Sequence, residues 1–122
     1  MKNNSTGFLH FVSAFKYSMS GLRVAVAETA IRHEVYLGVG HFVLLYLLKV
    51  CWQWCVCLSL LWALVLIVEI VNTAIEAVVD RVSPEYNVLA GRAKDLGSAA
   101  VFLALTMFLG AWAVVVWKTC IG

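Results

Sequence analysis

A row of polar side chains lies inside an otherwise apolar segment near the middle of the chain. At about 100° per residue of an α-helix these side chains fall on one face, and they are Glu69, Asn72, Thr73, Glu76 and Asp80. An acid at the centre of a membrane helix costs roughly 2.5–3.5 kcal/mol on insertion scales. Two acids within the apolar segment, Glu69 and Glu76, and the amide of Asn72 on one face are therefore expected to have a chemical use, with structural hydrogen bonding between helices as the alternative.

The spacing along this face indicates a division of labour. Seven residues at about 1.5 Å each put Glu69 roughly 10 Å deeper than Glu76. Glu76 and Asp80 then lie near water, within reach of a hydrated cation and a nucleotide, whereas Glu69 lies within reach of a lipid headgroup hydroxyl. Phosphoryl transfer needs a metal ion that neutralises the charge of the phosphate oxygens and a base that orients the attacking hydroxyl. Magnesium is satisfied by one or two carboxylates with phosphate oxygens, so Glu76 with one further acid would suffice, and Glu28, which follows the surface helix, is a candidate for the second ligand.

A cationic group that could face a phosphate follows at 91–98. Lys94 lies there at the start of an apolar helix, near exposed backbone N–H groups, and this combination suits a phosphate. Lysine and arginine beside a membrane also serve as plain topology anchors. The sequence contains neither GxxxxGK[ST] nor GxGxxG, so no familiar nucleotide-binding fold is expected. The residues alone thus predict a metal and phosphate site that faces lipid.

The elements that must position these groups are apolar helices. Of the 122 residues 63% are hydrophobic and 13% are charged, which is more apolar surface than a soluble fold of this size can bury. A bilayer needs about 20 mainly apolar residues per helix, and three segments qualify, at about 35–50, 56–79 and 98–117. A short hairpin with two interfacial tryptophans joins the first two, and a polar cytoplasmic loop at 80–95 joins the last two. The expected fold is all-α and integral to the membrane, a single domain over 1–122 with three transmembrane helices.

The basic residues indicate the orientation of these helices. Seven of them share one side if three helices alternate, namely Lys2, Lys16, Arg23, Arg32, Arg81, Arg92 and Lys94. Only Lys49 and Lys118 remain on the other side, which predicts a cytoplasmic N-terminus and polar loop. The first residues have no short apolar core and no small-residue cleavage site, so they are expected to stay in the mature protein.

The segment at about 6–33 is predicted to be an amphipathic helix on the cytoplasmic membrane surface. Its apolar residues recur every three or four positions, at Phe8, Phe11, Phe15, Met19, Leu22 and Val26. Packing of this helix onto the protein's own bundle is an equally open alternative. His41, inside the first span, is expected to face the bundle and bond a neighbour, with a proton relay as the alternative.

These motifs resemble the prokaryotic diacylglycerol kinase family. The string Glu69-x-x-Asn72-Thr73-Ala74-Ile75-Glu76-x-x-x-Asp80 is long and specific, and Glu85-Tyr86 and Ala93-Lys94-Asp95 follow it. Further similarity at 17–23 and 28–34 extends the match over nearly the whole chain. The similarity is closer to the Gram-negative diacylglycerol kinases than to the Gram-positive undecaprenol kinases, because of Arg81 and Gly91-Arg92.

The resemblance implies an ATP-dependent lipid kinase of the bacterial inner membrane that converts diacylglycerol to phosphatidic acid. It implies a homotrimer with three composite sites at subunit boundaries, each using magnesium and ATP, with no nucleic-acid partner. Glu69 would be the catalytic base, Glu28 and Glu76 would hold the metal, and Asn72 and Asp80 would support the site. The nucleotide would contact Tyr17, Glu28, Glu76, Glu85, Tyr86, Lys94 and Asp95. The lipid would border Ala14, Ser98 and Trp112 together with Glu69.

The chain also departs from the family pattern. His10, Asn87 and Ala90 stand where an arginine, a histidine and a serine are common, which bears on the phosphate and nucleotide contacts. The segment between Arg23 and Glu28 is one residue shorter, which bears on the alignment of the surface helix.

Two rival functions remain open at this stage. The first keeps the chemistry and changes the lipid to undecaprenol. The second is a small proton-coupled transporter, which predicts acids near the membrane midplane and a substrate path across it. Here the acids crowd one interface and continue into a polar segment with Lys94, which favours a nucleotide. A non-catalytic membrane subunit would leave the acidic row unexplained.

Overall fold

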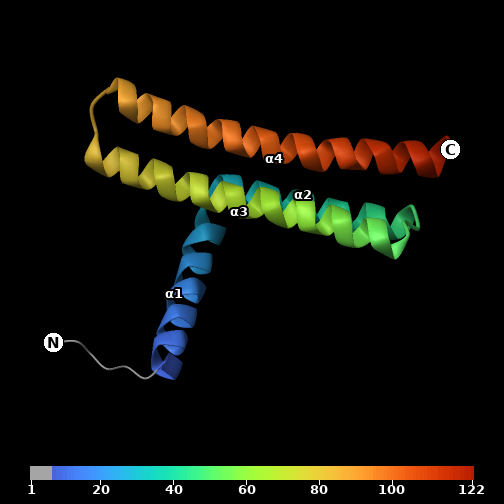
Figure 1. Cartoon of the computed structure of the whole chain (residues 1–122), viewed down its shortest axis with the longest axis horizontal. Helices are drawn as coiled ribbons and strands as arrows, with labels where there is room; N and C mark the ends of the chain where they lie inside the picture. Colours follow the sequence, from blue (N-terminus) through green and yellow to red (C-terminus); the bar gives the residue numbers. More distant parts are fainter. Residues whose placement is uncertain (1–6) are drawn as a thin grey trace.

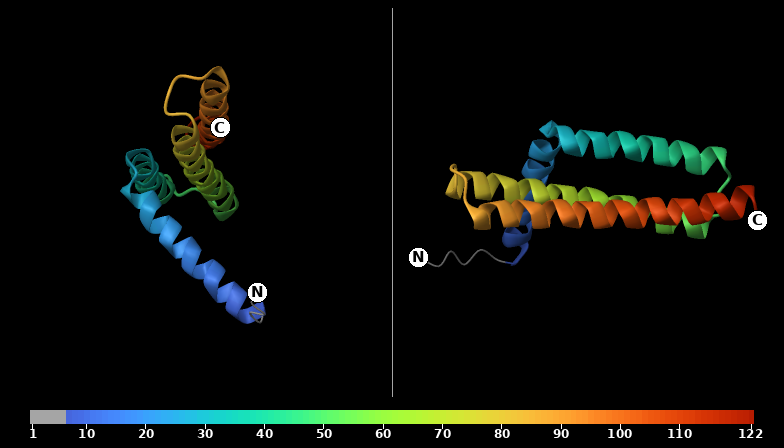
Figure 2. Two further views of the ribbon diagram at one scale, coloured as in Figure 1. Left: turned by 90° about the vertical axis from the view of Figure 1, so that its left-hand side faces the viewer. Right: turned by 90° about the horizontal axis from the view of Figure 1, so that it is seen from above.

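The computed structural model describes residues 7–122, and every regular element in that part of the chain is an α-helix. The helices are α1 (Gly7–Ala27), α2 (Thr29–Leu47), α3 (Trp52–Val82) and α4 (Val88–Cys120). Helices α3 and α4 lie side by side and antiparallel, and α2 runs along α3 (Figures 1 and 2). The predicted all-α fold is confirmed for the described residues.

The core of the molecule is the seam between α3 and α4. On α3 the buried positions are Leu58, Val65, Glu69 and Asn72, and on α4 they are Gly97, Ala104, Phe108, Trp112 and Val115. These spacings of three, four and seven residues keep the buried side chains on one face of each helix. The seam is therefore apolar over most of its length and becomes polar toward the C-terminal end of α3.

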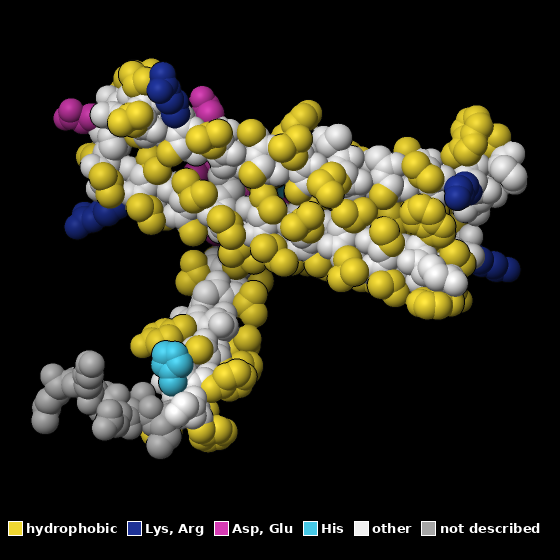
Figure 3. All heavy atoms as spheres, viewed as in Figure 1, with side chains coloured by type: hydrophobic (Ala, Val, Ile, Leu, Met, Phe, Trp, Pro, Cys, Tyr) yellow, Lys and Arg dark blue, Asp and Glu magenta, His cyan; other side chains and the backbone are white. Residues whose placement is uncertain are grey.

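Within residues 7–122 two helices are long and apolar enough to cross a membrane, and these are α3 and α4. Their 31 and 33 residues correspond to roughly 46 and 50 Å, so both exceed a hydrocarbon core of about 30 Å. Most of their surface is exposed in the single chain, and Figure 3 shows hydrophobic side chains along the bundle with charged ones toward its ends. The predicted span at 35–50 falls largely in α2, which is not one of these two helices and which carries Arg32, Glu34 and His41 among its 19 residues.

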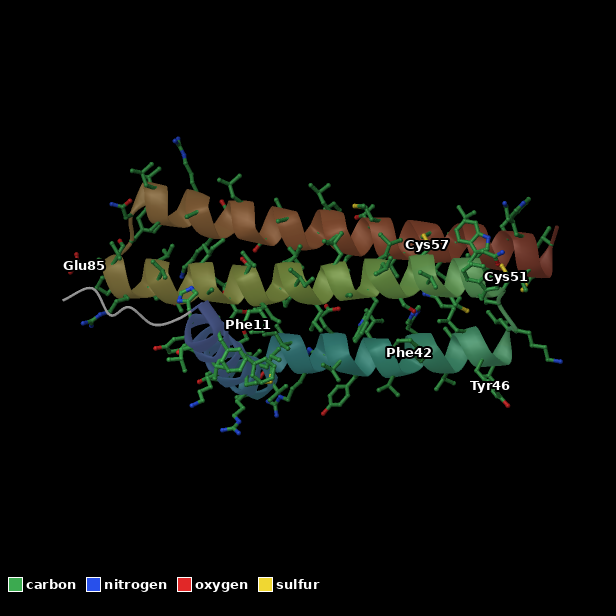
Figure 4. All side chains as sticks on the ribbon, turned by 60° about the horizontal axis from the view of Figure 1, so that its bottom comes forward. Phe11, Phe42, Tyr46, Cys51, Cys57 and Glu85 are labelled. Carbon is green, nitrogen blue, oxygen red and sulfur yellow. The ribbon has the colours of Figure 1, made fainter. Side chains whose placement is uncertain are left out.

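The predicted surface helix at 6–33 is divided in the structure. Residue 6, like Lys2, lies outside the described residues. Helix α1 ends at Ala27, Glu28 has an extended backbone with φ −79° and ψ 131°, and residues 29–33 form the first turns of α2. Helix α1 leaves the bundle at this junction and buries only Ala25 (Figure 1). It does not pack along the protein's own helices, and its apolar side chains, including Phe11 in Figure 4, are exposed.

The predicted polar loop at 80–95 is much shorter in the structure. Only residues 83–87 lie outside helices, because α3 continues to Val82 and α4 begins at Val88. The Asn87 side chain caps α4 by accepting hydrogen bonds from the N–H groups of Leu89 (2.9 Å) and Ala90 (3.3 Å). Polar residues on both sides of this short loop are thus held on helices rather than on a flexible segment.

Three helices meet at His41 in a buried polar junction. The Trp112 indole N–H of α4 donates to His41 Nδ1 at 3.1 Å. The ring proton must then be on Nε2, which lies 3.1 Å from the Ser59 hydroxyl of α3 and donates to it. The expectation that His41 faces the bundle and bonds a neighbour is confirmed.

The turn after α2 contains an unusual backbone conformation. Lys49 has φ 51°, in the left-handed region that favours glycine. It closes the helix as glycine commonly does, since the N–H of Val50 donates to the carbonyl of Leu45 (3.2 Å) and the N–H of Lys49 to that of Tyr46 (3.3 Å). Val50 also packs against the buried cluster that contains Leu45.

This turn predicts a stabilising substitution. Replacing Lys49 with Gly removes the left-handed strain and should raise the free energy of unfolding by about 0.5–1 kcal/mol. The measurement is reversible unfolding in mixed detergent micelles followed by circular dichroism. Lys49→Ala is the matched control, because it removes the same charge and keeps the strain. An equal gain in both variants would contradict the strain as the cause.

Candidate functional site

The polar row on α3 runs from buried to exposed. Glu69 and Asn72 are 8% and 7% exposed, Glu76 is half-buried, and Asp80 is exposed. Thr73 turns its hydroxyl onto the helix itself and donates to the Glu69 carbonyl at 2.9 Å. The burial of these side chains therefore decreases in the direction that the sequence predicts for their depth.

Asn72 forms a hydrogen bond to another residue of the polar row, Glu76. Its Nδ2 donates to Glu76 Oε1 at 3.3 Å, which fixes one oxygen of that carboxylate and leaves the other for a further ligand. The amide oxygen of Asn72 is buried and has no hydrogen-bond partner in the structure. It lies against Gly97 of α4, where an added Cβ would fall on it.

Lys94 supplies the positive charge opposite this row. Its Nζ lies 2.5 Å from Asp80 Oδ1 and is close enough to Glu76 for their charges to interact. The hydrogen bond to Asp80 raises the pKa of Lys94, so the side chain is a cation at neutral pH. Because both partners are well exposed, water screens the pair and a phosphate group can compete for Lys94.

A cleft of about 200 Å³ opens between the end of α3, the short loop and the start of α4. Four residues of the predicted site line it, namely Asp80, Glu85, Tyr86 and Lys94. Glu85 lies at the loop end of the molecule, and Cys51 and Cys57 lie toward the opposite end (Figure 4). Asn87, Ala90 and Gly91 also line the cleft, so two of the departures from the family pattern, Asn87 and Ala90, lie on it. Asp95 follows Lys94 and is exposed.

Other predicted site residues lie away from this cleft in the single chain. Ala14 and Tyr17 are exposed on α1, and Glu28 is exposed at the junction between α1 and α2. Ser98 is exposed on α4, one residue after Gly97, whereas Trp112 is buried and bonded to His41. Within residues 7–122 no three histidine, cysteine, aspartate or glutamate side chains gather closely enough to hold a metal ion by themselves.

Glu34 is a further acid near the polar row on α3, and the sequence motifs assign it no role. Its side chain lies close enough to Glu69 for the two charges to interact, and its Oε2 is buried without a hydrogen-bond partner. Its backbone carbonyl accepts the indole N–H of Trp62 at 2.9 Å, which holds this part of α2 against α3. The position of this acid at the edge of the predicted first span and the family similarity at 28–34 were the available signals.

Comparisons with known proteins identify the family of the chain. A model of the prokaryotic diacylglycerol kinase family matches residues 16–116. The chain is 46% identical to a diacylglycerol kinase of Escherichia coli (strain K12), over 97% of this chain and 98% of that protein. It is 41% identical to one of Pseudomonas aeruginosa, over 90% of each chain, and 39% identical to one of Haemophilus influenzae, over 88% of this chain and 92% of that protein. The chain therefore belongs to the prokaryotic diacylglycerol kinase family, and it is an all-α membrane protein with the fold described above.

The cap at the edge of the cleft gives a testable prediction. Asn87→Ala removes the acceptor for two N–H groups and should destabilise the start of α4 by about 1 kcal/mol. Hydrogen exchange at the amides of Leu89 and Ala90 should then be faster than in the unaltered protein. Asn87→Asp keeps an acceptor oxygen and is the control. Slow exchange in the alanine variant would contradict the capping role.

Proposed function

We propose that this protein transfers the γ-phosphate of ATP to diacylglycerol and forms phosphatidic acid at the cytoplasmic face of a bacterial inner membrane. The observation that carries the proposal is the row on α3, in which buried Glu69 lies two turns from half-buried Glu76, with cationic Lys94 near Glu76. A base at lipid depth and a carboxylate with a cation nearer the water are the groups that transfer from a nucleotide to a lipid requires. The relatives from Escherichia coli and Pseudomonas aeruginosa carry the name diacylglycerol kinase.

Two contacts between α3 and α4 support the proposed depths of Glu69 and Glu76 in the membrane. At one end Lys118 Nζ lies 5.5 Å from the centre of the Trp54 ring, and at the other Gly97 lies against Asn72. The two contacts are 18 residues apart on α3 and 21 apart on α4, or roughly 27–32 Å, which matches a hydrocarbon core of about 30 Å. Asn72 would then lie at the cytoplasmic boundary of the hydrocarbon core, with Glu69 just within the core and Glu76 on the water side of the boundary.

Helix α2 would be the third span of this arrangement. It runs along α3 and is bonded to it through His41 and Ser59 (Figure 2). Its neighbours would shield its polar residues, which compensates for its weaker hydropathy. The excess of basic residues on the side of Arg81 and Lys94 supports a cytoplasmic site.

Glu69 would act on the lipid hydroxyl. The 3-hydroxyl of a diacylglycerol that diffuses in laterally would approach the buried carboxylate and give it the proton as its oxygen bonds to the γ-phosphorus. The bond between that phosphorus and the β–γ bridging oxygen breaks, and ADP leaves with the bridging oxygen. Burial of Glu69 keeps competing water from the hydroxyl site, because little of its surface is exposed.

Magnesium suits the donors in this region. The carboxylates of Glu76 and Glu28 offer the oxygen ligands that the ion prefers, and one or two carboxylates with phosphate oxygens are enough for it. The absence of three gathered acids among the described residues is compatible with such a site. The bound ion would neutralise charge on the phosphate oxygens, while Asn72 orients Glu76 and Lys94 exchanges Asp80 for a phosphate.

The remaining predicted residues support a composite site in a homotrimer. The nucleotide would occupy the cleft beside Glu85 and Tyr86, and Asp95, which follows the cleft residue Lys94, would contact it from the exposed side of α4. Tyr17 and Glu28 lie apart from that cleft, so in this proposal they would come to it from a neighbouring subunit. The lipid would border Ala14 and Ser98, which are exposed, more closely than Trp112, which is buried against His41.

Phosphate transfer from Mg·ATP in detergent micelles tests the function. Labelled γ-phosphate should appear in phosphatidic acid with the unaltered protein, and both Glu69→Gln and Glu76→Gln should lower the rate by at least about 100-fold. Lys118→Gln removes a charge at the opposite end of the bundle and should keep the rate.

Parallel assays with undecaprenol distinguish the substrates. Product from undecaprenol alone would keep the mechanism and overturn the lipid. The absence of transfer to either lipid by folded protein would overturn the kinase proposal and favour proton-coupled transport.

A further inference from the structure

We infer that Gly97 is a positioning residue for the proposed phosphotransfer, because its missing side chain leaves the space in which Asn72 holds Glu76. The inference rests on the proposed function, since it assigns a residue that acts on the metal-binding carboxylate through Asn72.

The contact between Gly97 and Asn72 is unusually close. Gly97 is buried on α4, and a Cβ at this position would fall on Asn72 Oδ1 and lie 3.1 Å from Asn72 Cγ. The Asn72 side chain is more than nine-tenths buried, and its Oδ1 has no hydrogen-bond partner. The amide group of Asn72 is therefore packed between its own helix α3 and the backbone of α4 at Gly97.

The orientation of this amide follows from its neighbour Glu76. Asn72 Nδ2 donates to Glu76 Oε1 at 3.3 Å, and the reversed amide would bring a carbonyl oxygen against a carboxylate oxygen. The oxygen then points toward α4, at the position where Gly97 has no side chain, and it has no hydrogen-bond partner there. A buried acceptor without a strong partner is costly, so this amide orientation does not itself stabilise the fold. Its remaining effect is to hold the Glu76 carboxylate.

The same contact explains why a substitution would affect the site more than the fold. The atoms that a Cβ would meet at Gly97 are the far end of a side chain, which can rotate away, and not backbone. Rotation of the amide would break its bond to Glu76. Gly110, on the same helix, has nothing within 4 Å of an added Cβ and is exposed, so an alanine there alters neither packing nor the site.

The first test compares Gly97→Ala with the matched variant Gly110→Ala. Gly97→Ala should lower kcat about tenfold, the factor for ~1.4 kcal/mol, and should raise the Mg²⁺ concentration for half-maximal rate. KM for diacylglycerol should stay unchanged, and Gly110→Ala should resemble the unaltered protein in all three quantities. A Gly97→Ala variant with normal kcat and normal Mg²⁺ dependence would overturn the inference.

A double-mutant cycle separates positioning from packing. In an Asn72→Ala background Gly97→Ala should cause no further loss, because no amide remains to be displaced. An equal loss in both backgrounds would mean that Gly97 acts through helix packing, and the inference would fail. Unfolding in mixed detergent micelles should give Gly97→Ala a midpoint close to that of Gly110→Ala.

A spectroscopic readout keeps this inference distinguishable from the proposed function. The side-chain ¹⁵N resonance of Asn72 and the carboxyl ¹³C resonance of Glu76 can be recorded without ATP or lipid. Both should move in Gly97→Ala and stay in place in Gly110→Ala. If the unaltered protein transferred no phosphate, the proposed function would fail, while these resonances would still decide whether Gly97 positions Asn72. Unmoved resonances in Gly97→Ala would overturn the positioning role.

Discussion

The antiparallel contact between α3 and α4 is the interaction on which the remaining structure depends. One continuous stripe on each helix forms this contact, with apolar residues such as Leu58 and Phe108 over most of it and Asn72 opposite Gly97 toward the loop end. Burial of a carboxylate and an amide is unfavourable unless other contacts offset it. The apolar part of the seam supplies that offset and holds the two backbones close enough for Asn72 to meet Gly97. The candidate site is thus the polar end of the core itself.

The sequence was most informative where the structure depends on local periodicity. The polar face of α3 was predictable because the helical repeat alone decides which residues share a face. The short loop was missed, although Asn87 is a common helix-capping residue and offered a local signal. The break at Glu28 had no such signal, since its side chain makes no cap and its backbone conformation follows from the departure of α1. The nearness of Glu34 to Glu69 depends on how α2 packs against α3, and no pattern within one helix encodes it.

Helices α1 and α2 differ in how firmly they are held. Trp62 fixes α2 at one level, because its indole N–H bonds the Glu34 carbonyl and its ring fills the space that a side chain at Gly38 would need. His41 fixes α2 at a second level through α3 and α4. Helix α1 has few contacts beyond the junction at Glu28 (Figure 1). The angle of α1 therefore depends on surroundings outside the single chain, whereas the position of Glu34 is set within it.

The polar residues of α2 also bear on how the chain enters its membrane during synthesis. Glu34 and His41 are costly to leave in hydrocarbon without partners. Two groups that bond to this helix, Ser59 and Trp62, lie on α3, and a third, Trp112, lies on α4, so the ribosome makes all three later. In the proposed three-span arrangement a nascent α2 would therefore remain at the translocon until α3 and then α4 supply these partners, and it would partition into lipid together with them. The order of translation, and not only the final packing, would decide whether the chain acquires its topology.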